Sequence, residues 1–168
     1  MAEFDPVALL GVLVAHRLRF VVIGGVAARL RGAPLLTQDV DITPAADPEN
    51  LERLAAALED LEARLRTAGE PDGVAFPFDP QLIAAAGSWT LVTRLGDLDL
   101  VFLPAGSRGF PDLVKGSTEM SISVDRPLTV MVASLSDVIR TKEAAGRDKD
   151  RAALPMLRRT QQEIDDTT

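Results

Sequence analysis

Two aspartates separated by one residue, Asp39 and Asp41, are the first residues whose types and spacing could do chemistry. The apolar residues Val40 and Ile42 alternate with them, which is typical of a strand over residues 37–43 with both carboxylates on one face, about 7 Å apart along the chain. Carboxylates held this close repel each other unless a cation lies between them or one is protonated. Mg²⁺ prefers hard oxygen ligands and often binds carboxylates together with substrate phosphates. The pair therefore indicates a metal site; the alternative is the polar outer face of an edge strand.

A glycine pair precedes these aspartates. Gly24-Gly25 ends a short apolar run, residues 20–23, that we expect to be a buried strand, and a short helix is expected over residues 26–30. Glycine at this place lets backbone N–H groups approach a phosphate, and the start of a helix favours anions. Taken alone, the same dipeptide is equally compatible with an ordinary tight turn.

A third carboxylate, Asp99, lies between two leucines in another expected strand, residues 98–103. Because Leu98 and Leu100 should face the core, Asp99 should face away from it, as Asp39 and Asp41 do. Asp97 has the same parity, but it falls in the expected hairpin turn at residues 95–97 and is the weaker candidate ligand.

A polar segment near the C-terminus carries several cations. Residues 142–150 include Lys142, Arg147 and Lys149, followed directly by Asp150. A segment of this kind, placed after the sheet, could supply cations that bind phosphate, or it could be a solvated helix surface.

The elements that must position these residues form a mixed sheet with flanking helices, so the predicted fold class is mixed α/β, or α+β. A long helix is expected from Asp47-Pro48, with a leucine stripe that reaches Leu65, and residues 69–80 are expected to form a loop. Further helices are expected over residues 5–17 and 81–86, from Ser134, and from Asp148 with a kink or restart at Pro155; further strands are expected over residues 89–94, 119–124 and 128–132.

Composition limits the class of protein. The chain has 168 residues, which favours one domain over residues 1–160 with a polar tail at 161–168. It contains no cysteine, which excludes disulfides and thiolate metal sites and fits a cytoplasmic location. The apolar run at residues 7–15 is too short to cross a membrane and lacks a basic flank, so we expect neither a membrane span nor a signal peptide. The net charge of −7 argues against a general nucleic-acid binder.

Together these motifs resemble the polymerase-β-like nucleotidyltransferase superfamily. Its signature is an apolar residue followed by Gly-Gly or Gly-Ser, a spacer, Asp-x-Asp or Asp-x-Glu, and a later carboxylate on a neighbouring strand; here these are Ile23-Gly24-Gly25, Asp39-Val40-Asp41 and Asp99. Within the superfamily the chain most resembles the AbiEii-like proteins of bacterial toxin–antitoxin systems. That narrower resemblance rests on Gly-Gly-Val-Ala-Ala, Arg31-Gly32, Thr37-x-Asp39-x-Asp41, and the stretch from Ser134 to Asp150.

The resemblance implies a minimal nucleotidyltransferase fold and transfer of a nucleoside monophosphate from an NTP to an acceptor hydroxyl, with release of pyrophosphate. It implies that Asp39, Asp41 and Asp99 hold two Mg²⁺ or Mn²⁺ ions, and that Asp99 helps to deprotonate the acceptor. Backbone donors at Gly24 and Gly25 would hold the outer phosphates. Lys142 is the preferred triphosphate contact, followed by Arg147, and Asp150 would orient one of these cations.

Three functions remain open at this point. The acceptor could be RNA, such as the acceptor end of tRNA, in a toxin with an antitoxin protein as its partner. It could instead be a small hydroxylated molecule such as an aminoglycoside or lincosamide antibiotic, which suits the acidic chain somewhat better. The chain could also be a non-catalytic module that binds a nucleotide or a partner, although three intact aspartates count against this.

Overall fold

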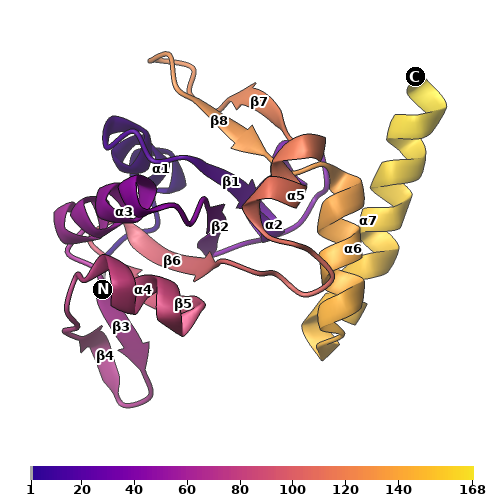
Figure 1. The fold of residues 1–168 in the computed structure, drawn as a ribbon. Coiled ribbons are helices and arrows are strands. Elements are labelled where there is room, and N and C mark those ends of the chain that lie inside the picture. The colour runs from indigo at the N-terminus through magenta and orange to yellow at the C-terminus, as the bar shows by residue number, and fades with distance from the viewer. Residues whose placement is uncertain (1) are drawn as a thin grey trace.

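An eight-stranded mixed sheet forms the centre of the computed structural model, which describes residues 2–168 (Figure 1). The strand order is β4-β3-β5-β6-β2-β1-β8-β7. The pairs β1–β8 and β2–β6 are parallel, and the other pairs are antiparallel. The strands are β1 Phe20–Ile23, β2 Asp39–Pro44, β3 Arg64–Thr67, β4 Glu70–Val74, β5 Ser88–Thr93, β6 Gly96–Val101, β7 Thr118–Ser121 and β8 Thr129–Val132. The predicted mixed fold class is confirmed.

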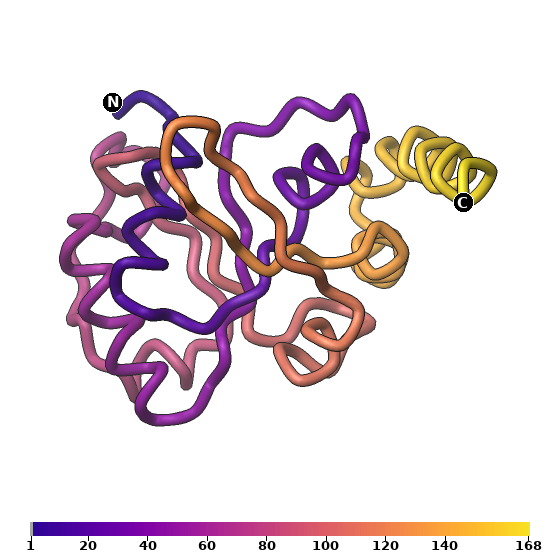
Figure 2. Tube along the Cα trace, turned by 90° about the horizontal axis from the view of Figure 1, so that it is seen from above, coloured from indigo at the N-terminus to yellow at the C-terminus, as the bar shows by residue number. Residues whose placement is uncertain are grey.

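Seven helices are present in the described part of the chain, and they lie on both sides of the sheet (Figure 2). Helices α1, α3 and α4 cover one face, while α2, α5 and the α6–α7 hairpin lie on the other side, with α6 packed against α2. The helices are α1 Pro6–Ala15, α2 Gly24–Leu30, α3 Pro48–Asp60, α4 Pro80–Ala86, α5 Phe110–Gly116, α6 Leu135–Ala145 and α7 Asp148–Thr167.

The central strands alternate as the sequence predicts. Val40 and Ile42 on β2, and Leu98 and Leu100 on β6, are fully buried. Leu54 and Leu58 of α3 are also fully buried in the same apolar core. Since successive side chains of a strand point to opposite faces, the aspartates between these apolar residues lie on the other face of the sheet, toward α2 and α6.

Helix ends follow the capping residues in the sequence. The side chains of Asp5, Asp47, Asp79 and Ser134 each accept a backbone N–H bond at the start of α1, α3, α4 and α6. Gly146 adopts a left-handed conformation, φ +63°, at the end of α6. Such caps satisfy backbone groups that the helix leaves without partners.

None of the helices within residues 2–168 combines the length and apolar character needed to cross a bilayer.

Two expectations about the middle of the chain are wrong. Helix α3 ends at Asp60, so Leu65 lies in β3 instead of continuing the leucine stripe, and residues 69–80 contain β4 instead of only a loop. The β3–β4 hairpin lies at the edge of the sheet and is mostly exposed, so its sequence lacks the apolar alternation that marks a half-buried strand. Helix α5, at residues 110–116, was also not predicted.

The last helix is longer than expected. Helix α7 runs continuously from Asp148 to Thr167 with Pro155 inside it, so the expected restart is wrong, whereas a kink at Pro155 remains a prediction; the polar segment after Gln161 is helical. The separation of a domain at residues 1–160 from a tail remains a prediction.

Asn50 joins three elements inside the protein. Its side chain is fully buried; Oδ1 accepts the backbone N–H of Arg19 at 2.8 Å, and Nδ2 donates to the carbonyls of Arg19 and Ala45 at 2.9 and 2.7 Å. We expect Asn50→Ala to lower the free energy of unfolding by about 3 kcal/mol, because buried backbone groups lose their partners. Urea denaturation measures this, with the exposed Gln162→Ala as control, expected to change stability by less than about 0.5 kcal/mol. Equal effects of the two substitutions would contradict the prediction.

Candidate active site

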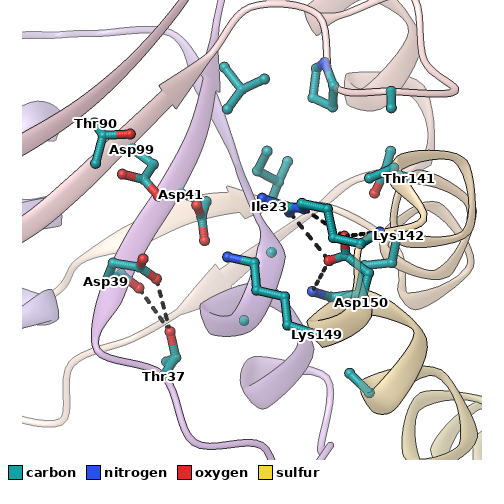
Figure 3. Close-up of a pocket in the computed structure, with 18 of the residues that line it drawn as sticks. Ile23, Thr37, Asp39, Asp41, Thr90, Asp99, Thr141, Lys142, Lys149 and Asp150 are labelled. Atoms are coloured by element: carbon teal, nitrogen blue, oxygen red, sulfur yellow. Dashed lines mark hydrogen bonds and ion pairs between the residues drawn. The ribbon is translucent and has the colours of Figure 1, made fainter.

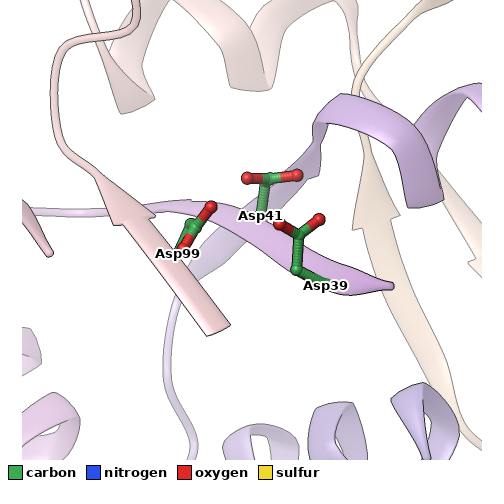
Figure 4. Close-up of side chains that lie close together, drawn as sticks. All are labelled: Asp39, Asp41 and Asp99. Carbon is green, nitrogen blue, oxygen red and sulfur yellow. The ribbon is translucent and has the colours of Figure 1, made fainter. Parts of the chain in front are cut away.

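Three carboxylates converge on the face of the sheet opposite α3 (Figure 4). Asp39 and Asp41 extend from β2, and Asp99 extends from β6, where parallel pairing places Asp99 directly beside Asp41. One oxygen from each of the three side chains lies within 4.8 Å of the other two. The register of two neighbouring strands, and not only the spacing along one of them, therefore brings these carboxylates together.

The donor set fits a divalent cation. Oδ1 of Asp99 is buried and has no hydrogen-bond partner among residues 2–168. A buried polar atom without a partner is costly, and a cation can satisfy it. Three half-buried carboxylates supply hard oxygen ligands of the kind that Mg²⁺ and Mn²⁺ take. The cluster could therefore bind metal.

Electrostatics in this cluster strongly favour a bound cation or proton. Burial, followed by the negative charges of Asp39 and Asp99, raises the pKa of Asp41 to about 8. Burial and the charge of Asp39 also raise the pKa of Asp99. Because these shifts arise from desolvation and like-charge repulsion, a divalent ion at the cluster would favour the ionised carboxylates.

The glycine pair makes space for this cluster. Gly24, with φ +64°, lies so close to Asp41 that a Cβ atom on Gly24 would overlap the carboxylate of Asp41. A Cβ on Gly25 would be 2.9 Å from Oγ1 of Thr37, and this hydroxyl donates to the carbonyl of Asp39 at 3.0 Å. Both glycines belong to α2, which begins two residues earlier than expected. They allow β2 and α2 to approach closely, whereas contact of their N–H groups with phosphate remains a prediction.

Cations line the opposite wall of a pocket of about 580 Å³ that contains the three carboxylates (Figure 3). Lys142 comes from α6, Arg147 from the α6–α7 connection and Lys149 from the start of α7. Lys142 and Arg147 form ion pairs with Asp150, as the sequence interpretation of Asp150 expected. The structure thus brings all of the predicted site residues to one pocket, and their roles remain predictions.

Asp97 is excluded from the cluster for a different reason than expected. It lies within β6, not in a turn, and it faces the same side as Asp99. Arg66 of β3 forms an ion pair with it. Sequence reasoning missed Arg66, since the hairpin that carries it was not predicted.

Comparison with solved structures identifies the fold of this chain. No family model and no curated protein matches the sequence. Among solved structures, the lincosamide antibiotic adenylyltransferase LnuA with lincomycin bound superposes with a TM-score of 0.57 at 14% identity, covering 90% of this chain and 92% of that one. This chain has the nucleotidyltransferase fold.

Two structures of ANT(2'')-Ia give the same result. The solution structure of this antibiotic-resistance factor matches with a TM-score of 0.53 at 18% identity, covering 90% of this chain and 81% of that one. Its crystal structure in complex with adenylyl-2"-tobramycin matches with a TM-score of 0.53 at 17% identity, covering 89% and 83%. These neighbours belong to the polymerase-β-like superfamily, and none of the comparisons supports the narrower resemblance to AbiEii-like proteins.

Gly24→Ala tests the packing of α2 against Asp41. The added methyl group must displace the carboxylate, so we expect weaker binding of Mn²⁺, measured by titration calorimetry. Gly69→Ala is the matched control: Gly69 also has a positive φ, +86°, but a Cβ there meets nothing within 4 Å. Both variants should lose about 1 kcal/mol of stability from backbone strain, and only Gly24→Ala should lose metal affinity. Unchanged Mn²⁺ affinity in Gly24→Ala would contradict the role of the close approach.

The raised pKa of Asp41 predicts an unusual pH dependence of the free energy of unfolding when a chelator removes divalent metal ions. Between about 3.9, the ordinary value, and about 8, the folded protein keeps a proton that the unfolded chain releases. The free energy of unfolding contributed by this site therefore falls as pH rises through that range. Asp41→Asn should remove this fall. The difference in free energy of unfolding between the wild type and Asp41→Asn, measured by urea titration at each pH, therefore isolates the contribution of Asp41. Mg²⁺ added at pH 8 should stabilise the wild type only, whereas parallel stability curves without metal would refute the assignment.

Proposed function

We propose that this chain is a metal-dependent nucleotidyltransferase that transfers a nucleoside monophosphate from an NTP to a hydroxyl group of a small molecule, with release of pyrophosphate. The observation that carries the proposal is the convergence of Asp39, Asp41 and Asp99, with a buried oxygen of Asp99 left unpartnered, in one pocket with a cationic wall. Nucleotidyl transfer needs both features, because the reaction depends on positioning and on neutralising phosphate charge.

Asp39, Asp41 and Asp99 would hold the divalent ions, two Mg²⁺ or Mn²⁺ by analogy with other two-metal sites. Such ions, when bound, neutralise charge on the phosphates and make the acceptor hydroxyl more acidic. The carboxylates are fixed for this task by two central strands whose alternate residues are fully buried. A site on rigid strands keeps its ligands in place without reorganisation during the reaction.

Asp99 is the candidate base of the reaction. Its Oδ1 has no partner among the described residues, and its pKa is raised by burial and by the charge of Asp39. Thr90 of β5 lies directly opposite Asp99 in the sheet register and lines the same pocket. An acceptor hydroxyl that lies over Thr90 would bring its proton within reach of Asp99.

The remaining site residues would hold the nucleotide. Backbone N–H groups at Gly24 and Gly25 are proposed to donate to phosphate oxygens, and Lys142 and Arg147 to supply positive charge near them. Asp150 pairs with both cations and so fixes the wall on which they lie.

A small acceptor is favoured by two observations. A pocket of about 580 Å³ has the size of typical small-molecule sites, and a net charge of −7 opposes binding of an RNA backbone. The structural neighbours are named as antibiotic-modifying enzymes, one with lincomycin and one with an adenylylated tobramycin. Two alternatives remain: RNA as the acceptor, with an antitoxin protein as partner, and a non-catalytic binding module. The label-transfer assay described below distinguishes between them.

Loss of a carboxylate from the cluster should abolish transfer. We expect Asp41→Asn and Asp99→Asn to reduce label transfer from α-labelled NTPs by about a hundredfold or more, because metal ions contribute several kcal/mol to such reactions. Asp97→Asn is the matched control, since Asp97 lies on the same face but is paired with Arg66, and it should retain most of the activity. Thermal melting checks that each variant folds. Full activity in Asp41→Asn would refute the proposed site.

The same assay identifies the acceptor. Each of the four labelled NTPs is incubated with Mg²⁺ and either a lincosamide and aminoglycoside panel or total RNA. Transfer to an antibiotic of the panel supports the proposal. Transfer to RNA alone would contradict a small-molecule acceptor and support the alternative in which RNA is the acceptor. NTP binding without transfer to any acceptor would favour the non-catalytic module.

A further inference from the structure

One side chain outside the carboxylate cluster is hydrogen-bonded to it. Oγ1 of Thr37 donates to Oδ1 of Asp39 at 3.3 Å and to the backbone carbonyl of the same residue at 3.0 Å. Figure 3 shows both bonds at the edge of the pocket, which Thr37 lines. Within residues 2–168, no other side chain from outside the cluster donates to a carboxylate oxygen of its three aspartates. Thr37 therefore has a relation to the cluster that no other lining residue shares.

Thr37 is held between two elements. It lies in the connection from α2 to β2, two residues before Asp39, the first residue of β2. On its other side a Cβ atom on Gly25 would be 3.0 Å from Cβ of Thr37, so the first turn of α2 packs directly against this side chain. A β-branched side chain has few χ1 rotamers. Packing against α2 therefore fixes the hydroxyl where it meets Asp39.

The bond from Thr37 restricts the Asp39 carboxylate. A side chain that rotates freely loses conformational entropy when it binds a cation, whereas one that is already held loses less. The hydroxyl is the donor, so the bond is made to the ionised carboxylate, which is the form that binds a metal ion. Groups that hydrogen-bond to metal ligands in this way orient them, and their loss typically weakens metal binding by about 10–100-fold.

We propose that Thr37 is a positioning residue of the metal site, whose hydroxyl holds the carboxylate of Asp39 in the orientation that binds a divalent cation. This inference rests on the metal site of the proposed function. Thr37 contacts neither the metal ion nor the reacting atoms; it acts through Asp39. The contact with Gly25 gives α2 a second link to the cluster, beside that of Gly24 with Asp41.

Mn²⁺ binding to the full chain, followed by the electron paramagnetic resonance signal of the free ion, tests this role. We expect Thr37→Val, which removes the hydroxyl and keeps the shape, to weaken Mn²⁺ binding by about tenfold. Thr37→Ser should recover most of the affinity. Thr141→Val is the matched control, because Thr141 lines the same pocket but its hydroxyl donates only to the carbonyls of Asp137 and Val138. This control should bind Mn²⁺ as the wild type does.

Label transfer from α-labelled NTPs gives a second measurement, which decides if Mn²⁺ binds tightly only together with an NTP. In Thr37→Val the Mn²⁺ concentration for half-maximal transfer should rise by about tenfold. Most of the maximal rate should return at saturating Mn²⁺, because the three carboxylates are intact. Urea denaturation in chelator should show similar losses of stability in Thr37→Val and Thr141→Val, since each loses a hydroxyl bonded to the backbone.

The outcomes distinguish this role from the proposed function. If the wild type transfers label and Thr37→Val needs no more Mn²⁺ than the wild type, the role of Thr37 is refuted while the proposed function stands. The role is also refuted if Thr141→Val loses as much Mn²⁺ affinity, if Thr37→Ser recovers none of it, or if only Thr37→Val is strongly destabilised in chelator. If the wild type neither binds Mn²⁺ nor transfers label, the proposed function fails and this inference fails with it.

Discussion

Repulsion among three carboxylates is the constraint around which this molecule is organised. Asp39, Asp41 and Asp99 approach within 4.8 Å because β2 and β6 pair in parallel with a register that sets Asp41 beside Asp99. Burial of Asp41, followed by the negative charges of Asp39 and Asp99, makes its ionised form unfavourable and raises its pKa to about 8. The apolar residues that alternate with the aspartates on the same strands offset it, because they are fully buried against α3 and its neighbours. The buried apolar face of the two strands stabilises the fold. On the other face the negative charges of the carboxylates repel each other, and a bound cation would reduce that repulsion.

Local pattern predicted which face of its strand each carboxylate occupies, and the family resemblance supplied the expectation that Asp99 lies on a neighbouring strand. Strict alternation around Asp39, Asp41 and Asp99 set the face of each side chain, and strand pairing then needed only to bring β2 beside β6. Helix starts at Asp5, Asp47 and Ser134 were equally local, since each cap bonds to its own first turn. Features of this kind depend on residues a few positions apart, so the sequence displays them directly.

Other features depend on partners that are distant along the chain. The β3–β4 hairpin is nearly all exposed and leaves no periodic signal, and with it Arg66 and its pairing with Asp97 were missed. The tight space at Gly24 is defined by Asp41, seventeen positions later, so the sequence indicated a phosphate-binding turn or an ordinary tight turn but not this close approach. The unequal pairing of Lys142, Arg147 and Lys149 depends on the burial of Asp150 between α6 and α7. Tertiary packing decides such cases, and a single sequence does not display it.

Helix α2 connects the two walls of the pocket. At its start, Gly24 lies against Asp41 of the carboxylate wall. At its end, Arg31 donates from Nε to the carbonyl of Ala133 at 3.1 Å and from its guanidinium to that of Val132 at 2.7 Å, immediately before α6 begins. Helix α2 therefore contacts the carboxylate wall at one end and, at the other, the residues that lead into α6, the helix whose last turn carries Lys142.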